Sequence, residues 1–203
     1  MAHVPNVKCV LVGECAVGKT TLLIALTENR FAVQWVPSML DNVSIALEAQ
    51  GRLFNLNLWE VRGTPGCDYT RLRSLSYPET DVFLVFFSII HRYSLERVKD
   101  WVQEVRHNCP DAKVFVVLTK LDLRDDPATN EQLKDMGKTM ISEAEGRELA
   151  NEVGADKYME CSTMHGINLK ELFEEVCSIT VSSTLKDPTP QKISTKRKKC
   201  PMM

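Results

Sequence analysis

The sequence predicts an α/β domain in which helices cover both faces of a mainly parallel sheet of six strands. Apolar runs of strand length alternate with helical segments along the chain, and this alternation is typical of parallel sheets. The expected strands are residues 7–12, 43–50, 53–59, 82–88, 113–118 and 157–161. The second and third of these meet at Gly51 and should pair as an antiparallel hairpin.

The helices are expected at residues 19–28, 93–107, 142–153 and 168–182. Ser142 and Glu145 have the spacing of a capping box, which marks the start of the third helix. A chain of 203 residues is long enough for one domain with a substantial core. We expect that domain to span residues 1–183 and a basic tail to occupy residues 184–203.

Composition narrows the class of protein. No apolar run reaches the length of a membrane-spanning helix, and no secretory signal is expected at the N-terminus. The seven cysteines lack metal-ligand spacing and are interpreted as free thiols. Residues 186–203 hold six Lys or Arg and one Asp, so they carry +5 while the rest of the chain carries −7. An acidic body with a basic tail argues against nucleic-acid binding and favours a globular unit with an electrostatic tether.

A glycine-rich loop follows the first strand and opens the first helix. The run GECAVGKT, residues 13–20, has the spacing of a P-loop, in which backbone amides and a helix N-terminus surround phosphates. Lys19 would reach the β- and γ-phosphates, and the Thr20 hydroxyl would ligate Mg²⁺. The residues expected to contact nucleotide here are Gly13, Cys15, Ala16, Val17, Gly18, Lys19, Thr20 and Thr21. An accidental glycine-rich turn is the alternative, but the strand before and the helix after favour a nucleoside triphosphate site.

A second candidate segment follows the fifth strand. In Thr119-Lys120-Leu121-Asp122 the Asp122 carboxylate could accept from the ring N–H and amino group of guanine, a donor pair that adenine lacks. The stem of Lys120 can cover the ring face, and Thr119 and Leu123 complete the expected contacts. After the sixth strand, backbone N–H groups of Ser162 and Thr163 could bind the guanine O6. The tetrapeptide alone would be a weak signal, but it gains specificity from the P-loop upstream.

With these motifs in place, the chain resembles Ras-superfamily small GTPases, and specifically the Rac-like branch of the Rho family, over about residues 7–181. Residues 36–42 are similar to the first switch of that family, residues 71–78 to the stretch after its second switch, and residues 119–126 to its base-recognition segment. Residues 124–140 resemble the insert helix of Rho proteins. The resemblance implies a Ras-like fold and a monomeric switch that binds GTP or GDP with Mg²⁺ and hydrolyses GTP. It also implies exchange factors, a GDP-dissociation inhibitor and signalling to the actin cytoskeleton.

The resemblance also assigns roles to single residues. Phe31 would pack on the guanine edge, and Ser38 stands where the family has a threonine that senses the γ-phosphate and ligates Mg²⁺. Ser38 keeps the hydroxyl, so that contact is expected to survive. Residues 35–43 correspond to the effector-binding segment, but Leu40 and Val43 replace aromatic residues there, which leaves the set of effectors open.

The catalytic parts depart from the family pattern. Where the family has Asp-Thr-Ala-Gly-Gln, this chain has EVRGT, residues 60–64. Thr64 stands at the position of the glutamine that orients the attacking water, next to the retained Gly63. Cys15 replaces a glycine beside the γ-phosphate and should obstruct an incoming arginine finger, which is worth roughly 10³–10⁵ in rate. Glu60 replaces an aspartate that contacts Mg²⁺ through water, and its extra methylene should disturb that contact.

These changes leave several hypotheses. The first is a GTPase with weak hydrolysis, insensitive to activating proteins, that stays mostly loaded with GTP. Another is a pseudo-GTPase scaffold that binds nucleotide weakly, and a third is neutral drift in an enzyme that still cycles. An ATP-using P-loop kinase is disfavoured by Asp122.

The tail combines two membrane signals. Residues 196–199 are all Lys or Arg, and Cys200-Pro201-Met202-Met203 has a cysteine fourth from the end, as in a prenylation box. One lipid holds a protein only marginally, and adjacent basic residues supply the second signal. We therefore expect lipidation at Cys200 and a location on the cytoplasmic face of the plasma membrane or an endomembrane, with a cytosolic pool. A solvated or nuclear-targeting tail is the alternative.

Overall fold

The computed structural model describes residues 4–28, 42–61 and 73–184. The sheet runs in the order β2-β3-β1-β4-β5-β6. Its strands are β1 (Asn6–Gly13), β2 (Asn42–Ala49), β3 (Arg52–Glu60), β4 (Val82–Ser88), β5 (Lys113–Thr119) and β6 (Lys157–Glu160). Only the β2–β3 pair is antiparallel, and the other neighbouring strands are parallel. The expected α/β fold with a six-stranded, mostly parallel sheet is confirmed.

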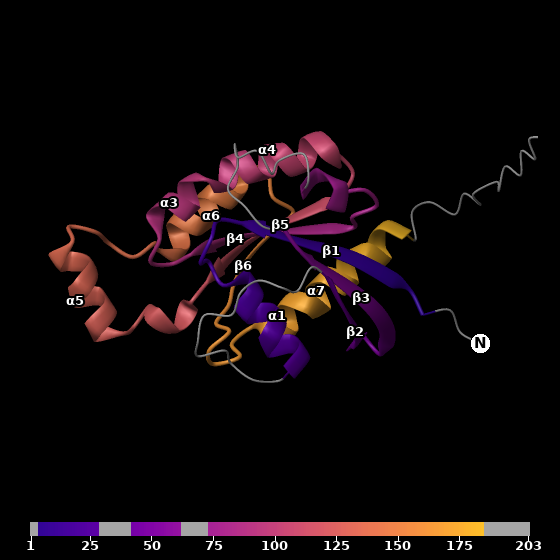
Figure 1. Cartoon of the computed structure of the whole chain (residues 1–203), viewed down its shortest axis with the longest axis horizontal. Helices are drawn as coiled ribbons and strands as arrows, with labels where there is room; N and C mark the ends of the chain where they lie inside the picture. The colour runs from indigo at the N-terminus through magenta and orange to yellow at the C-terminus, as the bar shows by residue number, and fades with distance from the viewer. Residues whose placement is uncertain (1–3, 29–41, 62–72, 185–203) are drawn as a thin grey trace, which may run out of the picture.

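Helices cover both faces of this sheet (Figure 1). On one face lie α1 (Lys19–Glu28) and α7 (Leu169–Thr184), and on the other α3 (Arg92–Glu96), α4 (Val98–Asn108) and α6 (Glu143–Glu152). The helix α5 (Pro127–Asp135) stands away from the sheet at one end of the molecule (Figure 1). Two single-turn 3₁₀ helices, Ser74–Ser76 and Leu121–Leu123, lie in the connections. In the described part of the chain, no helix is long and apolar enough to cross a bilayer.

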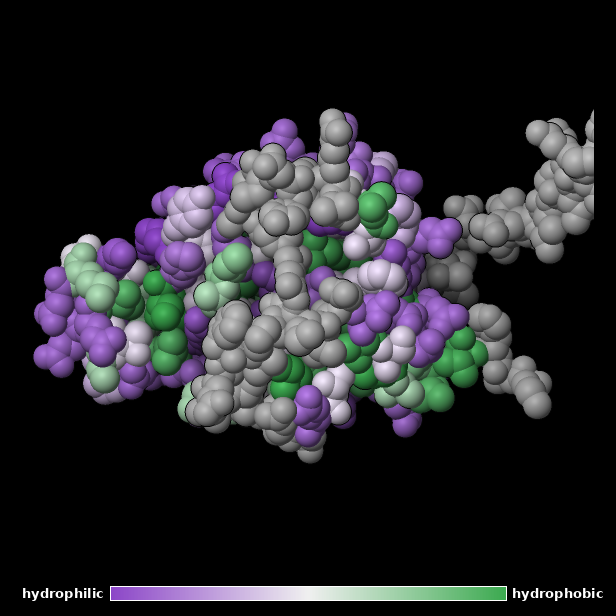
Figure 2. All heavy atoms as spheres, viewed as in Figure 1, coloured by the Kyte–Doolittle hydropathy of each residue, from purple (hydrophilic) through white to green (hydrophobic). Residues whose placement is uncertain are grey.

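The central strands explain the two separate cores. Because side chains alternate along a strand, Leu11, Leu84 and Phe115 face α1 and α7. The residues next to them, such as Val10 and Phe83, face α4 and α6. Strands that are buried on both faces need continuous apolar runs, and this is why β1, β4 and β5 were readable from the sequence. Outside the core, hydrophilic side chains dominate the visible surface over α4 (Figure 2).

The structure corrects one expected helix. Residues 93–107 were expected to form a single helix, but α3 and α4 are separate elements joined at Arg97. Arg97 keeps right-handed helical φ and ψ angles of −74° and −13°, and its N–H donates to the carbonyl oxygen of Tyr93 at 3.1 Å, so the backbone stays helical between the two elements. Neither Gly nor Pro marks this position, and the sequence therefore gave no signal for it.

The fold brings four loops to one edge of the sheet. Parallel strands place their carboxyl ends together, and ligands of such sheets bind outside those ends. Here the carboxyl ends of β1, β3, β5 and β6, at Gly13, Glu60, Thr119 and Glu160, lie at that edge. The candidate phosphate-binding and base-binding motifs, residues 13–20, 119–122 and 162–163, lie in the loops that follow these ends.

Candidate functional site

The loop between β1 and α1 is shaped by two glycines. Gly13 has a φ of +135°, and a Cβ there would lie 2.4 Å from the carbonyl oxygen of Phe86 on β4. Gly18 has a φ of +105° but open space around it, so its requirement for glycine is conformational. Between them the Cys15 and Ala16 residues are exposed, whereas Val17 is buried in the core. The loop therefore curves outward over the start of α1, leaving its central residues open to a ligand.

Lys19 is held inside this loop. Its ammonium group donates to the carbonyl oxygens of Gly13 at 2.7 Å and Glu14 at 2.9 Å, and the residue is only 6% exposed. An ammonium group has three donors, so these two bonds leave a third for a phosphate oxygen. Burial lowers the pKa of Lys19, while the nearby Glu60, Cys15 and Glu14 act in the opposite direction. A buried cation is costly unless it is paired with a negative charge, and a bound polyphosphate would supply that charge.

Thr20 and Glu60 form the described part of the expected metal site. The Thr20 hydroxyl donates to Glu60 Oε1 at 2.6 Å, although the two residues are 40 positions apart. Hydroxyl and carboxylate oxygens are the ligand types that Mg²⁺ takes in nucleotide sites, where phosphates and water complete the octahedron. When bound, the ion would neutralise charge on the β- and γ-phosphates. The longer side chain of Glu60 thus still brings its carboxylate to Thr20.

The last residue of β5 and the segment that follows it, residues 119–124, are called the base loop below. Asp122 Oδ1 accepts a short hydrogen bond from the hydroxyl of Ser162, which is fully buried. Lys120 takes a left-handed conformation with φ of 60° and ψ of 39°, and its side chain is half-buried. Burial lowers the pKa of Lys120, although Asp122 raises it. The serine fixes one carboxylate oxygen of Asp122 while the carboxylate keeps further acceptor positions for a ligand.

A single hydroxyl connects the base loop to the phosphate loop. Thr119 Oγ1 lies 2.6 Å from the carbonyl oxygen of Val17 and 3.0 Å from that of Phe87. Thr119 is 2% exposed, so this contact is structural and the side chain would act on a nucleotide through the loop it holds. The two halves of the site are therefore fixed relative to each other, as recognition of a base and a phosphate chain in one molecule requires.

Residues 8–181 match the family model described as the Ras family. This match covers most of the chain and both loops of the site. The protein belongs to the Ras family. It is therefore a small GTPase, a guanine-nucleotide-binding switch of the P-loop class, and GTP with Mg²⁺ is the ligand expected of the family.

The geometry corrects one contact expected in this Ras-family protein. The backbone N–H of Ser162 donates to the carbonyl oxygen of Ile167 at 3.1 Å and is thus not offered to the guanine O6. Ser162 serves the site through its hydroxyl instead. Thr163, which is half-buried, becomes the candidate for the O6 contact. Leu123 is half-buried in the base loop, and Thr21 is half-buried in the first turn of α1.

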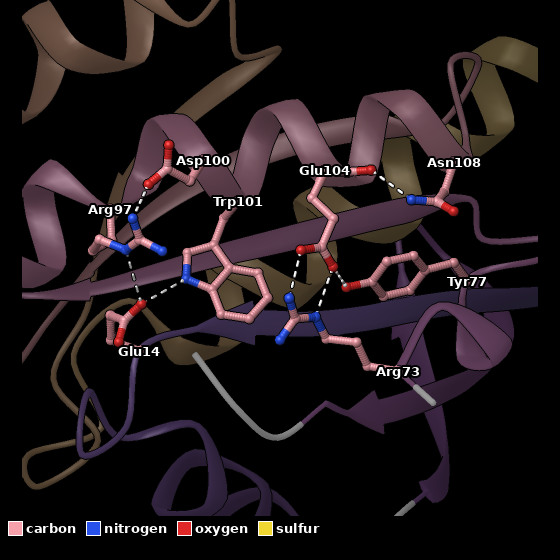
Figure 3. Close-up of polar contacts among 8 residues, drawn as sticks. All are labelled: Glu14, Arg73, Tyr77, Arg97, Asp100, Trp101, Glu104 and Asn108. Atoms are coloured by element: carbon pink, nitrogen blue, oxygen red, sulfur yellow. Dashed lines mark hydrogen bonds and ion pairs between the residues drawn. The ribbon is translucent and has the colours of Figure 1, made fainter. Parts of the chain in front are cut away.

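A buried polar cluster behind the phosphate loop was not anticipated from the sequence (Figure 3). The Glu14 carboxylate, 4% exposed, accepts from the indole N–H of Trp101 at 3.3 Å and lies 3.6 Å from Arg97 Nε. On the other side of Trp101, Arg73 lies 4.8 Å from the ring centroid. An acidic residue inside a loop that binds phosphates was the available signal, because such a carboxylate needs a buried donor partner.

Arg73 also belongs to this cluster and links it to Glu104 and Tyr77. Its guanidinium makes two hydrogen bonds to the Glu104 carboxylate, at 2.7 and 2.6 Å, and the Tyr77 hydroxyl donates to the same carboxylate at 2.8 Å (Figure 3). The side chains of Arg73 and Glu104 are 2% and 14% exposed. Trp101 therefore lies between the phosphate loop and the first described residue after the segment 62–72.

Several expected site residues lie outside the described part of the chain. They are Phe31, Ser38, Gly63, Thr64 and Cys200. Most of the expected effector-binding segment and the whole tail from residue 185 onward also lie outside it. The site residues that the structure does place are assembled on one edge of the sheet.

Proposed function

We propose that this protein is a Rho-type small GTPase that binds guanine nucleotide normally and hydrolyses GTP slowly, so that it is held mostly in the GTP form. The observation that carries this proposal is the contrast within one site. The buried ammonium group of Lys19 and the Asp122 carboxylate held by Ser162 support nucleotide binding. The residues that family members use to position water and accept an arginine finger are replaced.

Cys15 is the most direct of these replacements. Its side chain is exposed on the phosphate loop, whose next residues lead to the lysine that would hold the phosphates. A glycine at this position would leave room for an arginine from an activating protein. A thiol side chain occupies that room, and losing the arginine forfeits roughly 10³–10⁵ in rate.

Thr64 and Glu60 support the same conclusion. Threonine lacks the amide with which glutamine orients the attacking water, and phosphoryl transfer depends mainly on such positioning and on charge stabilisation. Glu60 brings its carboxylate to Thr20, at the expected metal site, and we place the effect of its longer side chain on the rate of hydrolysis.

Single-turnover hydrolysis of GTP, with and without a Rho-type activating protein, tests the proposal. We expect slow intrinsic hydrolysis and little or no acceleration. An acceleration of several orders of magnitude would refute the proposal, because it would require an intact water-positioning and arginine-binding arrangement.

The second candidate function is a scaffold that binds nucleotide only weakly. It is favoured by the bond from Thr20 to Glu60, which engages the hydroxyl that Mg²⁺ would need. The purified protein discriminates the two functions: a stoichiometric guanine nucleotide supports the switch, and a protein that remains folded without nucleotide supports the scaffold.

The Rho branch and the membrane tether are part of the same proposal. Helix α5 lies within residues 124–140, where a Rho-type insert is expected. Asp126 caps it by accepting from the Thr129 N–H at 2.9 Å, and Leu133 anchors it with 8% exposure.

The basic run 196–199 and Cys200 support prenylation and membrane binding. Exchange factors and effectors acting through residues 35–43 are expected partners. Membrane association that is unchanged in Cys200→Ser would contradict the tether.

A further inference from the structure

The base loop is held in place by the last residue of β6 and the two residues that follow it. Three consecutive residues, Glu160, Cys161 and Ser162, each bind a different residue of that loop. Ser162 holds Asp122 through its hydroxyl, and the carbonyl oxygen of Cys161 accepts from the Leu121 N–H at 3.1 Å. The Ser162 contact belongs to the site already described, and the Cys161 contact is between backbone groups. The third, from Glu160, has no role in that site so far.

Glu160 holds the far end of the base loop through Arg124. The guanidinium donates to both carboxylate oxygens, at 2.6 and 2.8 Å, in the bidentate arrangement that fixes direction as well as distance. The side chain of Glu160 is 12% exposed and that of Arg124 is 30% exposed. The pair is therefore shielded from water more than an ordinary surface ion pair, which contributes little to the free energy of unfolding.

Glu160 is itself fixed in place. The Tyr158 hydroxyl donates to its Oε1 at 2.6 Å, and Asn168 donates to its carbonyl oxygen at 2.9 Å. Burial alone would raise the pKa of Glu160, but the bonds from Arg124 and Tyr158 hold it below its ordinary value. Tyr158 in turn packs on Gly146 of α6, where a Cβ would come within 2.3 Å of the hydroxyl. The carboxylate is thus charged and rigidly placed, as a support for a loop must be.

The backbone conformation of the base loop explains why such support is needed. Lys120 is in the left-handed region, where a residue with a side chain is strained, and the 3₁₀ turn Leu121–Leu123 follows it directly. A strained loop keeps its shape only when contacts on both sides define it. Ser162 defines it at Asp122 and Glu160 defines it at Arg124, on either side of Leu123.

We infer that Arg124 and Glu160 are positioning residues for guanine specificity: they hold the base loop so that the Asp122 carboxylate meets both donors of the guanine edge. The inference rests on the proposed role of Asp122 as the group that recognises guanine. Neither residue is among those expected to contact the nucleotide. They act through the loop, and their loss should weaken the recognition of the base more than the grip on the phosphates.

Two nucleotides that differ only at the base test this inference. Inosine diphosphate (IDP) keeps the ring N–H of GDP but lacks the 2-amino group, so it can give Asp122 one donor instead of two. The dissociation rates of GDP and IDP are measured for the full-length protein and for Arg124→Met, which keeps much of the apolar stem and removes the guanidinium. The wild-type protein should release IDP about 10-fold or more faster than GDP, since a hydrogen bond to a charged group is lost.

The expected result is a fall in this IDP-to-GDP ratio in Arg124→Met, by about three-fold or more, because GDP release accelerates and IDP release changes less. Arg124→Lys should restore the ratio only in part, since lysine keeps the charge but not the bidentate geometry. Tyr158→Phe, which removes one bond to Glu160 without removing charge, should lower the ratio slightly. Lys157→Met is the matched control. Lys157 also lies on β6, but its 2.7 Å ion pair joins it to Glu175 on α7, away from the base loop.

The outcomes separate the inference from the proposed function. A ratio that stays at the wild-type value in Arg124→Met and Tyr158→Phe overturns the inference, whether or not both rates rise together, because uniform loosening is what a merely structural pair would give. A wild-type protein that releases GDP and IDP equally fast overturns the role of Asp122, and the inference with it.

Discussion

The site has a base side, formed by the base loop and Ser162, and a phosphate side, formed by residues 13–20 and Glu60. The two sides differ in how many of the residues typical of the family they retain. On the base side, Asp122, Ser162 and Thr119 form a connected set of buried or half-buried contacts that a guanine-binding loop needs. On the phosphate side, Lys19 and Thr20 are in place, but Cys15 and Glu60 stand beside them where the family has other residues. Under the proposed function, binding and hydrolysis depend on different residues, so that hydrolysis can weaken while binding persists.

Restoring the catalytic residues should give the largest effect. We expect the triple variant Cys15→Gly, Glu60→Asp, Thr64→Gln to hydrolyse GTP about 10³–10⁵ times faster than the wild type in the presence of a Rho-type activating protein. The measurement is phosphate release in a single turnover. Cys15→Gly alone should regain part of the acceleration. A triple variant as slow as the parent would place the defect elsewhere.

Changing the base side should alter which base is bound. Asp122→Asn removes a carboxylate that would accept two hydrogen bonds from guanine, so GDP affinity should fall by about 10²-fold or more. The affinity for xanthosine diphosphate should rise, because the asparagine amide can donate to its 2-oxo group. Asp125→Asn, an exposed position in the next turn, is the matched control. Equal losses for both nucleotides would show that the variant had merely disordered the loop.

The cluster around Trp101 should contribute stability on the phosphate side. Glu104→Ala leaves Arg73 as a buried cation without its bidentate partner, and breaking such a pair costs about 3–5 kcal/mol of unfolding free energy. Urea denaturation measures this loss. The exposed pair between Lys99 and Glu152 provides the control, since Glu152→Ala should cost about 1 kcal/mol or less. Equal losses in the two variants would contradict the burial argument.

A pH titration should give the smallest effect, on the helix that supports the base side. The Glu145 carboxylate closes the capping box of α6 and pairs with Arg92 at 2.7 Å. Hydrogen bonds from Arg92 and from Ser142 lower the pKa of Glu145 to about 2. Because the folded pKa lies below the unfolded one, its stabilisation is complete above about pH 4.3 and is lost as the pH falls toward 2.

The variant Glu145→Ala measures that contribution. At neutral pH it should lower the free energy of unfolding by about 1 kcal/mol, the usual worth of a helix cap. The difference between variant and wild type should shrink below about pH 4.3. A difference that stayed constant down to pH 2 would mean that the carboxylate charge is not what stabilises the helix.

The parts of the fold that were predictable have local signals. Apolar runs marked β4 and β5, the glycines marked the phosphate loop, and Ser142 with Glu145 marked the start of α6. The order of these elements was enough to place the motifs at one edge of the sheet. The joint between α3 and α4 was missed because Arg97 stays in a helical conformation.

The parts of the site that were not predictable are contacts between residues far apart in the chain. Glu14 and Trp101 are 87 positions apart, and Arg124 and Glu160 are 36 apart. No spacing rule links such pairs, since only the folded sheet brings them together. Ser162 was assigned to the right loop but with its backbone N–H as the contact, because the bond of that N–H to Ile167 depends on how the following turn closes.

The nucleotide carried by the protein in cells tests the central claim most directly. The full-length chain is recovered quickly from cells, denatured, and its bound nucleotide is identified and counted. The account predicts about one guanine nucleotide per chain, mostly GTP, because the base side and Lys19 bind it while hydrolysis is slow. A protein that carries mostly GDP would contradict slow hydrolysis, and one that carries adenine nucleotide or none would contradict the binding site itself.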